Sequence, residues 1–152
     1  VVRAIATVLR DNLTASDSRL GLRVKALAGL VYAAVAGSES LARENRKLAV
    51  RMSVDEGTLE AVARFAAEPA DDLAGETGIA DALARLEPLP GLGGEAALAL
   101  LLAKAVSPSP ALVPAPLGTL VSTTLSPEAQ VELIVWVAVQ QMLHRLGCFL
   151  DA

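Results

Sequence analysis

The sequence predicts an all-α protein that folds as one domain, a helical bundle of about seven or eight helices. Two observations support this fold class. Ala and Leu, both strong helix formers, dominate a chain in which 53% of residues are hydrophobic and only 3% are aromatic. No segment shows the alternating pattern of a convincing β-strand. At 152 residues the chain is long enough to bury a core as a single domain covering residues 1–152.

Helical spacing starts with the first residues. Val1, Ile5, Val8 and Leu9 predict a helix over residues 1–13. Since the chain begins with Val1 and not Met, already in helical rhythm, we expect a trimmed N-terminus or a missing leader, and residues before Val1 that could complete a site.

A long apolar helix is predicted over residues 17–37. Its Ala and Gly content extends around nearly the whole circumference, which indicates a central helix buried on most sides. Gly37 is a natural stop. An amphipathic helix then follows over residues 38–52.

The segment "SVDE", residues 53–56, reads as a capping box with Ser53 as N-cap of a helix to about residue 67. A shorter helix should run to about residue 86. Residues 87–95, "EPLPGLGGE", contain two Pro and three Gly and form the clearest linker.

The remaining chain predicts a buried helix after the linker, a Pro-rich and partly helical loop at 107–118, and a long final helix. The last helix has the best start signals, with Ser126 as N-cap, Pro127 in the first position and Glu128 near the positive end of the dipole.

Two segments resemble the alkylhydroperoxidase D-like, or carboxymuconolactone decarboxylase, superfamily. They are "LRVKALAGLVYAAVAGSESLARENRKLAVRMSVDEGTLEAV" (22–62) and "LSPEAQVELIVWVAVQQMLHRLG" (125–147). The first resembles the family's core segment, in which a Gly-Cys-x-x-Cys-x-x-x-His helix start follows an Ala-rich helix. The resemblance implies an AhpD-like all-helical oligomer and a peroxiredoxin-type, antioxidant oxidoreductase activity.

The site residues that the resemblance implies are all replaced. With Gly37 on the motif glycine, Ser38 and Leu41 stand at the two cysteines and Asn45 at the histidine. Ala26 stands at the family's upstream acidic position. Peroxide reduction needs a thiolate, and a proton relay needs a group that titrates near neutral pH, so these four residues predict no dithiol peroxidase activity. Whether the chain is an enzyme stays open.

Other residues offer simpler or different interpretations. Ser38 is interpreted first as a helix N-cap. His144 and Cys148 lie four apart on one helix face and form a weak alternative catalytic pair. Glu128 and Glu132 are interpreted as surface residues that complement the helix dipole. Arg145 is expected to pair with a carboxylate such as Glu132 or Asp151. Four aromatic residues are expected in the core or an interface: Tyr32, Phe65, Trp136 and Phe149.

The sequence therefore leaves several functions open. The first is a divergent alkylhydroperoxidase-like protein without dithiol activity. The second is a helical oligomeric binding or scaffold module that holds a small apolar ligand. The third is a cysteine-independent, decarboxylase-like enzyme, although the aligned positions offer no general acid or base.

Composition limits the partners. A net charge of −4 with scattered basic residues disfavours nucleic acid. The longest apolar run is too short to cross a membrane, and we expect no cofactor and no metal site. A single cysteine fits a cytoplasmic location. The mean hydropathy of +0.49 predicts that excess apolar surface is hidden in a homo-oligomer.

Overall fold

The computed structural model describes residues 18–150, together with residues 7 and 10, and is all-helical over this part of the chain. It contains seven α-helices and one short 3-10 helix there, and no strand. The expected helix over 1–13 lies largely outside the described residues. The helices are α2 (Gly21–Ala36), α3 (Glu39–Arg51), α4 (Glu56–Ala67), η1 (Ala70–Leu73), α5 (Glu76–Leu86), α6 (Glu95–Val106), α7 (Ala115–Thr124) and α8 (Pro127–Leu150).

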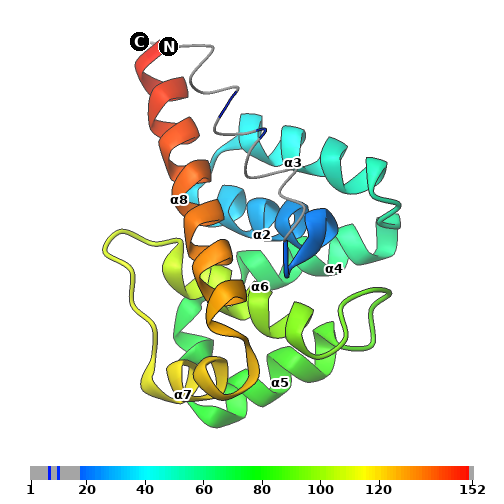
Figure 1. The fold of residues 1–152 in the computed structure, drawn as a ribbon, viewed down its shortest axis with the longest axis vertical. Coiled ribbons are helices and arrows are strands. Elements are labelled where there is room, and N and C mark those ends of the chain that lie inside the picture. Colours follow the sequence, from blue (N-terminus) through cyan, green and yellow to red (C-terminus); the bar gives the residue numbers. More distant parts are fainter. Residues whose placement is uncertain (1–6, 8–9, 11–17, 151–152) are drawn as a thin grey trace.

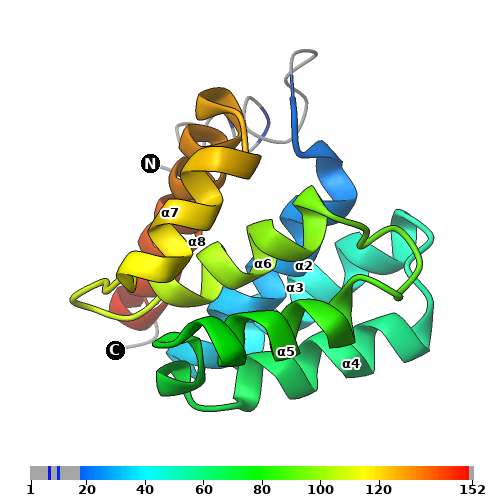
Figure 2. The same ribbon diagram turned by 90° about the horizontal axis from the view of Figure 1, so that it is seen from below.

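Helix α2 is the centre of the bundle, as its composition predicts. It packs against α3, α4, α6 and α8 (Figure 1). Ala26, Leu27, Ala28 and Val31 are completely buried. Helix α6 is the second buried helix, and α4 and α5 run along one edge of the molecule beside it (Figure 2).

The break between α2 and α3 is made by Gly37, as predicted. This glycine lies in the left-handed region with a φ of 66°, and its N–H donates to the carbonyls near the end of α2. The N–H of Ser38 donates to the carbonyl of Ala33 over 2.9 Å, which completes a Schellman-type ending. The chain therefore reverses within two residues, and α3 folds back along α2.

Close packing of α3 on α2 depends on a second glycine. A Cβ atom on Gly29 would lie 2.1 Å from Oδ1 of Asn45, so the Asn45 side chain occupies the space that a larger residue would need. Asn45 is itself 5% exposed. Its amide thus lies directly against the backbone of the central helix.

The predicted capping box at residue 53 is wrong. Ser53 adopts a φ of 59° and helps to end α3, with its N–H donating to the carbonyl of Val50. The N-cap of α4 is Asp55, whose carboxylate accepts from the N–H of Thr58 over 2.9 Å and from its hydroxyl over 2.7 Å. These hydrogen bonds from Thr58 lower the pKa of Asp55. The turn shifts the start of the helix because Val54 is drawn into the core, where it is 5% exposed.

The elements after α5 follow the predictions, except that α7 begins inside the segment predicted as a Pro-rich loop. Residues 87–94 form a loop, and it is fixed to the core by Leu92, which is fully buried. The Pro-rich segment stays irregular only to residue 114, because α7 begins at Ala115 with a proline in its first turn. Ser126 caps α8 as expected: the N–H of Ala129 donates to its hydroxyl over 3.2 Å.

Lys104 is an unexpected buried cation in α6, only 2% exposed. Its Nζ donates to the carbonyl of Phe65 in the last turn of α4 over 2.5 Å and lies 4.4 Å from the centre of the Phe65 ring. The negative end of a helix dipole and an aromatic face both attract a cation. Burial lowers the pKa of Lys104, although Glu68 and Asp72 act in the opposite direction. Lys104 thus joins α6 to the end of α4.

The contact between Gly29 and Asn45 predicts a destabilising substitution. In Gly29→Ala the new methyl group would collide with a hydrogen-bonded, buried side chain, and we expect a loss of about 2 kcal/mol in the free energy of unfolding. Urea denaturation followed by circular dichroism measures this change.

The matched control is Gly147→Ala in α8, where a Cβ would meet no atom within 4 Å. Helix propensity alone should make this variant about 0.5–1 kcal/mol more stable. Shortening Asn45 as well, in Gly29→Ala with Asn45→Ala, should recover part of the loss. Equal stabilisation by both glycine substitutions would contradict the contact.

Candidate functional site

A groove between α3 and α8 is the candidate site. Its volume is about 460 Å³, within the range of small-molecule sites in proteins. The residues that line it are mostly apolar, with two amides and one carboxylate: Leu41, Glu44, Asn45, Leu48, Trp136, Gln140 and Leu143. The groove exists because both helices pack on α2 and neither fills the space between them.

Two buried amides form the polar part of the groove. Asn45 is 5% exposed and Gln140 is 2% exposed. Nδ2 of Asn45 donates to the carbonyl of Leu41 over 2.9 Å and to Oε1 of Gln140 over 2.7 Å. A backbone carbonyl only accepts hydrogen bonds, so this contact fixes the orientation of the Asn45 amide and, through it, that of Gln140.

One donor is left over from this arrangement. Since Oε1 of Gln140 faces Asn45, the Nε2 group of Gln140 is directed elsewhere, and it has no hydrogen-bond partner among the described residues. Although Gln140 is only 2% exposed, its Nε2 atom is not fully enclosed, so solvent or a ligand can reach it. The groove therefore combines an apolar lining with a hydrogen-bond donor that a ligand oxygen or nitrogen could satisfy.

Among the described residues that line the groove, Glu44 has the only titratable side chain. It lies at the exposed rim and pairs with Lys47, whose Nζ is 2.8 Å from its Oε1. The hydrogen bond and the charge of Lys47 lower the pKa of Glu44, so it is ionised near neutral pH. The described residues that line the groove include one carboxylate and no cation, so its electrostatics favour an uncharged ligand over an anionic one.

The structure brings together two of the four positions that the sequence pointed to. Leu41 and Asn45 both line the groove. Ala26 is fully buried inside α2, and Ser38 precedes α3 as its N-cap; neither is a lining residue. Ser38 makes no side-chain cap hydrogen bond, and its hydroxyl lies 3.4 Å from that of Ser40.

Trp136 and Gln140 also line the groove. From the sequence, Trp136 was expected only in the core or an interface, and Gln140 was not singled out. They lie four apart on the inner face of α8, and a glutamine within an apolar stripe is the signal that could have identified the site. Nε1 of Trp136 donates to the carbonyl of Lys25 over 2.7 Å, which fixes the indole at the floor between α8 and α2.

The two residues of the alternative catalytic pair, His144 and Cys148, have different surroundings. Nδ1 of His144 lies 3.5 Å from the hydroxyl of Tyr32, and the two rings meet edge to face at 6.3 Å. Burial raises the pKa of Tyr32, so its hydroxyl remains protonated. Cys148 is exposed. The contact of His144 is thus with a buried phenol. Among the four aromatic residues expected in the core or an interface, Tyr32, Phe65 and Trp136 are buried, whereas Phe149 is 77% exposed.

Glu132 has a different role from the one predicted. Its side chain is 17% exposed, and its Oε1 lies 2.6 Å from Nζ of Lys25, which is 2% exposed. The hydroxyl of Ser18 and the N–H of Arg19 also donate to its carboxylate, over 2.5 Å and 2.8 Å. Glu132 is therefore a partly buried anchor that joins α8 to buried Lys25 and to the residues that precede α2. Within the chain Glu132 does not pair with Arg145, and Asp151 lies outside the described residues.

Burial by itself would raise the pKa of Glu132, but the hydrogen bonds from Lys25, Ser18 and Arg19, together with the charge of Lys25, outweigh it and lower the pKa. The sequence signal for this pair was Lys25, a cation at the start of a long apolar run. A buried lysine needs a partner, and the sequence alone does not say which carboxylate supplies it.

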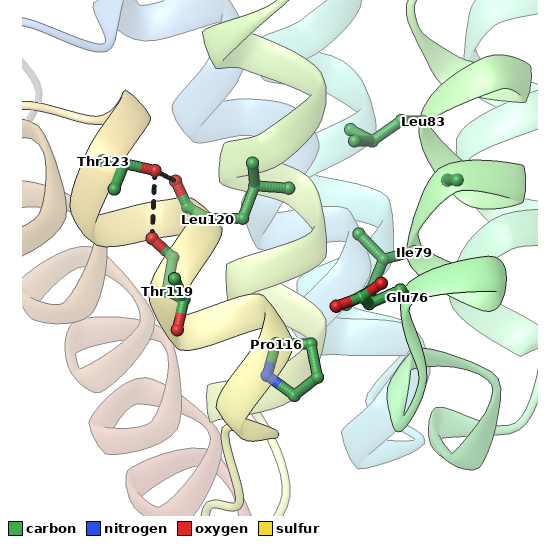
Figure 3. Close-up of a pocket in the computed structure, with 8 residues that line it drawn as sticks. Glu76, Ile79, Leu83, Pro116, Thr119, Leu120 and Thr123 are labelled. Atoms are coloured by element: carbon green, nitrogen blue, oxygen red, sulfur yellow. Dashed lines mark hydrogen bonds between the residues drawn. The ribbon is translucent and has the colours of Figure 1, made fainter.

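A second hollow of about 370 Å³ lies between α5 and α7 (Figure 3). Ile79, Leu83 and Leu120 line it. The hydroxyl of Thr123 donates to carbonyls of its own helix over 3.0 Å and is not free for a ligand. This hollow has no side-chain amide donor in its lining, whereas the α3–α8 groove has Nε2 of Gln140, so we take the groove as the site.

Metal binding and membrane insertion receive no support from the part of the chain that the structure describes. It contains no group of three or more His, Cys, Asp or Glu side chains placed to hold a metal ion. None of its helices has both the length and the apolar character needed to cross a membrane.

Comparison of the chain with protein-family models, with curated proteins and with solved structures finds no match. The candidate site thus rests on its own geometry.

The buried pair of Lys25 and Glu132 generates a stability prediction. Glu132→Gln leaves a buried cation without this carboxylate, and we expect the free energy of unfolding to fall by about 3 kcal/mol. Urea denaturation at neutral pH measures the loss. The matched control is Glu60→Gln in α4, whose ion pair with Arg64 is exposed on both sides and should contribute less than about 0.5 kcal/mol.

The same pair predicts a pH dependence. Because the pKa of Glu132 is lower in the folded protein than its ordinary value of 4.5, its contribution is fully present above pH 4.5. The contribution is lost as the pH falls through the folded-state pKa. The stability difference between the wild type and Glu132→Gln should therefore shrink in acid, and a difference that stays constant or grows would contradict the assignment.

Proposed function

We propose that this protein binds a small, uncharged and largely apolar molecule in the groove between α3 and α8. The observation that carries the proposal is the Nε2 group of Gln140, which has no hydrogen-bond partner in the described part of the chain and lies beside an apolar wall. The matching ligand has a flat or compact apolar body and one hydrogen-bond acceptor, such as a ketone, ester or amide oxygen. The apolar body would pack on Leu41, Leu48 and Trp136.

The resemblance to the alkylhydroperoxidase D-like superfamily is retained as a proposal of descent. In this proposal the chain is a divergent member that keeps the helical bundle and lacks dithiol peroxidase activity. What supports the loss of activity is local: the groove residues at motif positions are Leu41 and Asn45, and the chain's single thiol, Cys148, is exposed elsewhere on α8. A leucine cannot form a disulfide, and an amide cannot relay a proton near neutral pH.

A decarboxylase-like reaction is the weaker alternative. It would need a general acid or base in contact with the substrate. Glu44 is the one titratable lining residue, and it is exposed and already paired with Lys47. Binding therefore fits the groove better than catalysis does. A homo-oligomer remains part of the proposal.

Ligand binding is tested with two probes of nearly the same shape, acetylnaphthalene and ethylnaphthalene, which differ by one carbonyl oxygen. Trp136 is the chain's single tryptophan, so its indole N–H signal in an NMR titration reports on the groove. We expect the acetyl compound to bind about tenfold more tightly, because one hydrogen bond to Gln140 contributes about 1.4 kcal/mol.

The variant Gln140→Leu removes the donor and should make the two probes bind equally. The matched control Gln141→Leu alters the next residue of α8, which is not a lining residue of the groove, and should keep the tenfold preference. The proposal fails if neither probe shifts the Trp136 signal, or if the preference survives in Gln140→Leu.

The absence of dithiol chemistry is tested separately with cumene hydroperoxide and dithiothreitol. We expect no turnover above the rate without protein, since a dithiol cycle needs two thiols in one site. Cys148→Ala is the control for slow reaction of the exposed thiol. Robust turnover that persists in Cys148→Ala would show that the chain reduces peroxides by another route.

A further inference from the structure

We infer that the outer face of α8 is a self-complementary seam on which two copies of this chain pair antiparallel. The inner face of α8 is buried against α2 and α6, whereas its outer face carries large apolar side chains that remain exposed. Val131 is 61% exposed, Val135 43% and Met142 37%. Apolar surface of this extent on one helix indicates an interaction site.

The exposed residues follow a heptad pattern. The outer positions recur at alternating spacings of three and four along the helix: Glu128, Val131, Val135, Ala138, Met142, Arg145 and Phe149. This is the a/d spacing of a coiled-coil seam, in which each residue packs between residues of a facing helix. All seven positions are exposed.

The seam is complementary to itself in the antiparallel direction. When two α8 helices cross between residues 136 and 137, positions equidistant from that point lie in the same layer. Val135 then meets Ala138 of the second copy, and Val131 meets Met142. The small Ala138 beside Val135 allows the two helices to approach closely at the centre.

In this register, residues of opposite charge lie opposite each other at both ends of the seam. Glu128 of one copy lies in the layer of Arg145 of the other, about 13 Å from the crossing point on a rise of 1.5 Å per residue. Both side chains are exposed, and no ion pair is formed by either among the described residues. A twofold dimer would contain this pair twice, as expected for an isologous interface. In a parallel pair the like charges would face each other, which selects the antiparallel arrangement.

The size of the seam sets the expected affinity of the dimer. Four central apolar residues span about 16 Å of a single helix, so the interface lies at the small end of specific protein interfaces. We expect a dimer with a micromolar dissociation constant. The groove is independent of it, because Trp136 and Gln140 belong to the buried faces of α8.

Sedimentation equilibrium on the full chain tests the seam. The wild type should dimerise, and Val135→Glu should weaken dimerisation at least about 100-fold, because it places two carboxylates in the central layers. Val50→Glu is the matched control: Val50 is 55% exposed on α3, away from the seam, and its substitution should leave dimerisation unchanged. Circular dichroism confirms that each variant remains helical.

Charge reversal tests the register. Glu128→Arg and Arg145→Glu should each weaken the dimer about tenfold, since each places like charges in both end layers. The double variant restores opposite charges and should return to within about threefold of the wild type. A chain that stays monomeric at all concentrations, an equal effect of Val50→Glu and Val135→Glu, or a double variant as weak as the single ones would each overturn the inference.

Discussion

The structure depends on the close burial of α2 on nearly all of its sides. An apolar helix can be surrounded by four others only if its side chains are small where a neighbour crosses. Gly29 supplies that space for Asn45 and α3, and Ala26 and Ala28 are completely buried. Because α3 and α8 both rest on α2, the spacing between them, and with it the candidate groove, is set by this central helix.

Polar groups inside the bundle connect the helices to one another. Lys25 joins α2 to α8 through Glu132. The backbone carbonyl of Lys25 also accepts a hydrogen bond from the indole of Trp136, which lies on α8 as well. Lys104 joins α6 to the end of α4 through the carbonyl of Phe65. An apolar interior tolerates many packings, whereas a buried charge is stable only beside its partner. In this bundle, buried polar contacts fix the positions of helices that Ala and Leu side chains alone would leave less defined.

Helix α8 serves three purposes with two faces. Its inner face packs into the core, where Leu133 is completely buried. The same face carries Trp136 and Gln140 into the groove. Its outer face, with Val131 and Val135, is exposed and forms the proposed dimer seam. The proposed ligand site and the proposed interface are thus separated by the width of one helix.

The sequence by itself determined the helical class, the central position of α2, the stop at Gly37 and the start of α8, because these depend on local spacing, backbone conformation and capping. It also pointed to Leu41 and Asn45, which line the candidate groove. Only the tertiary structure decided that Lys25 pairs with Glu132, that Gln140 joins Asn45, and that Asp55 rather than Ser53 caps α4. The pairs join residues about a hundred positions apart, and the cap depends on the burial of Val54, so each follows from packing between helices, which helical periodicity does not record.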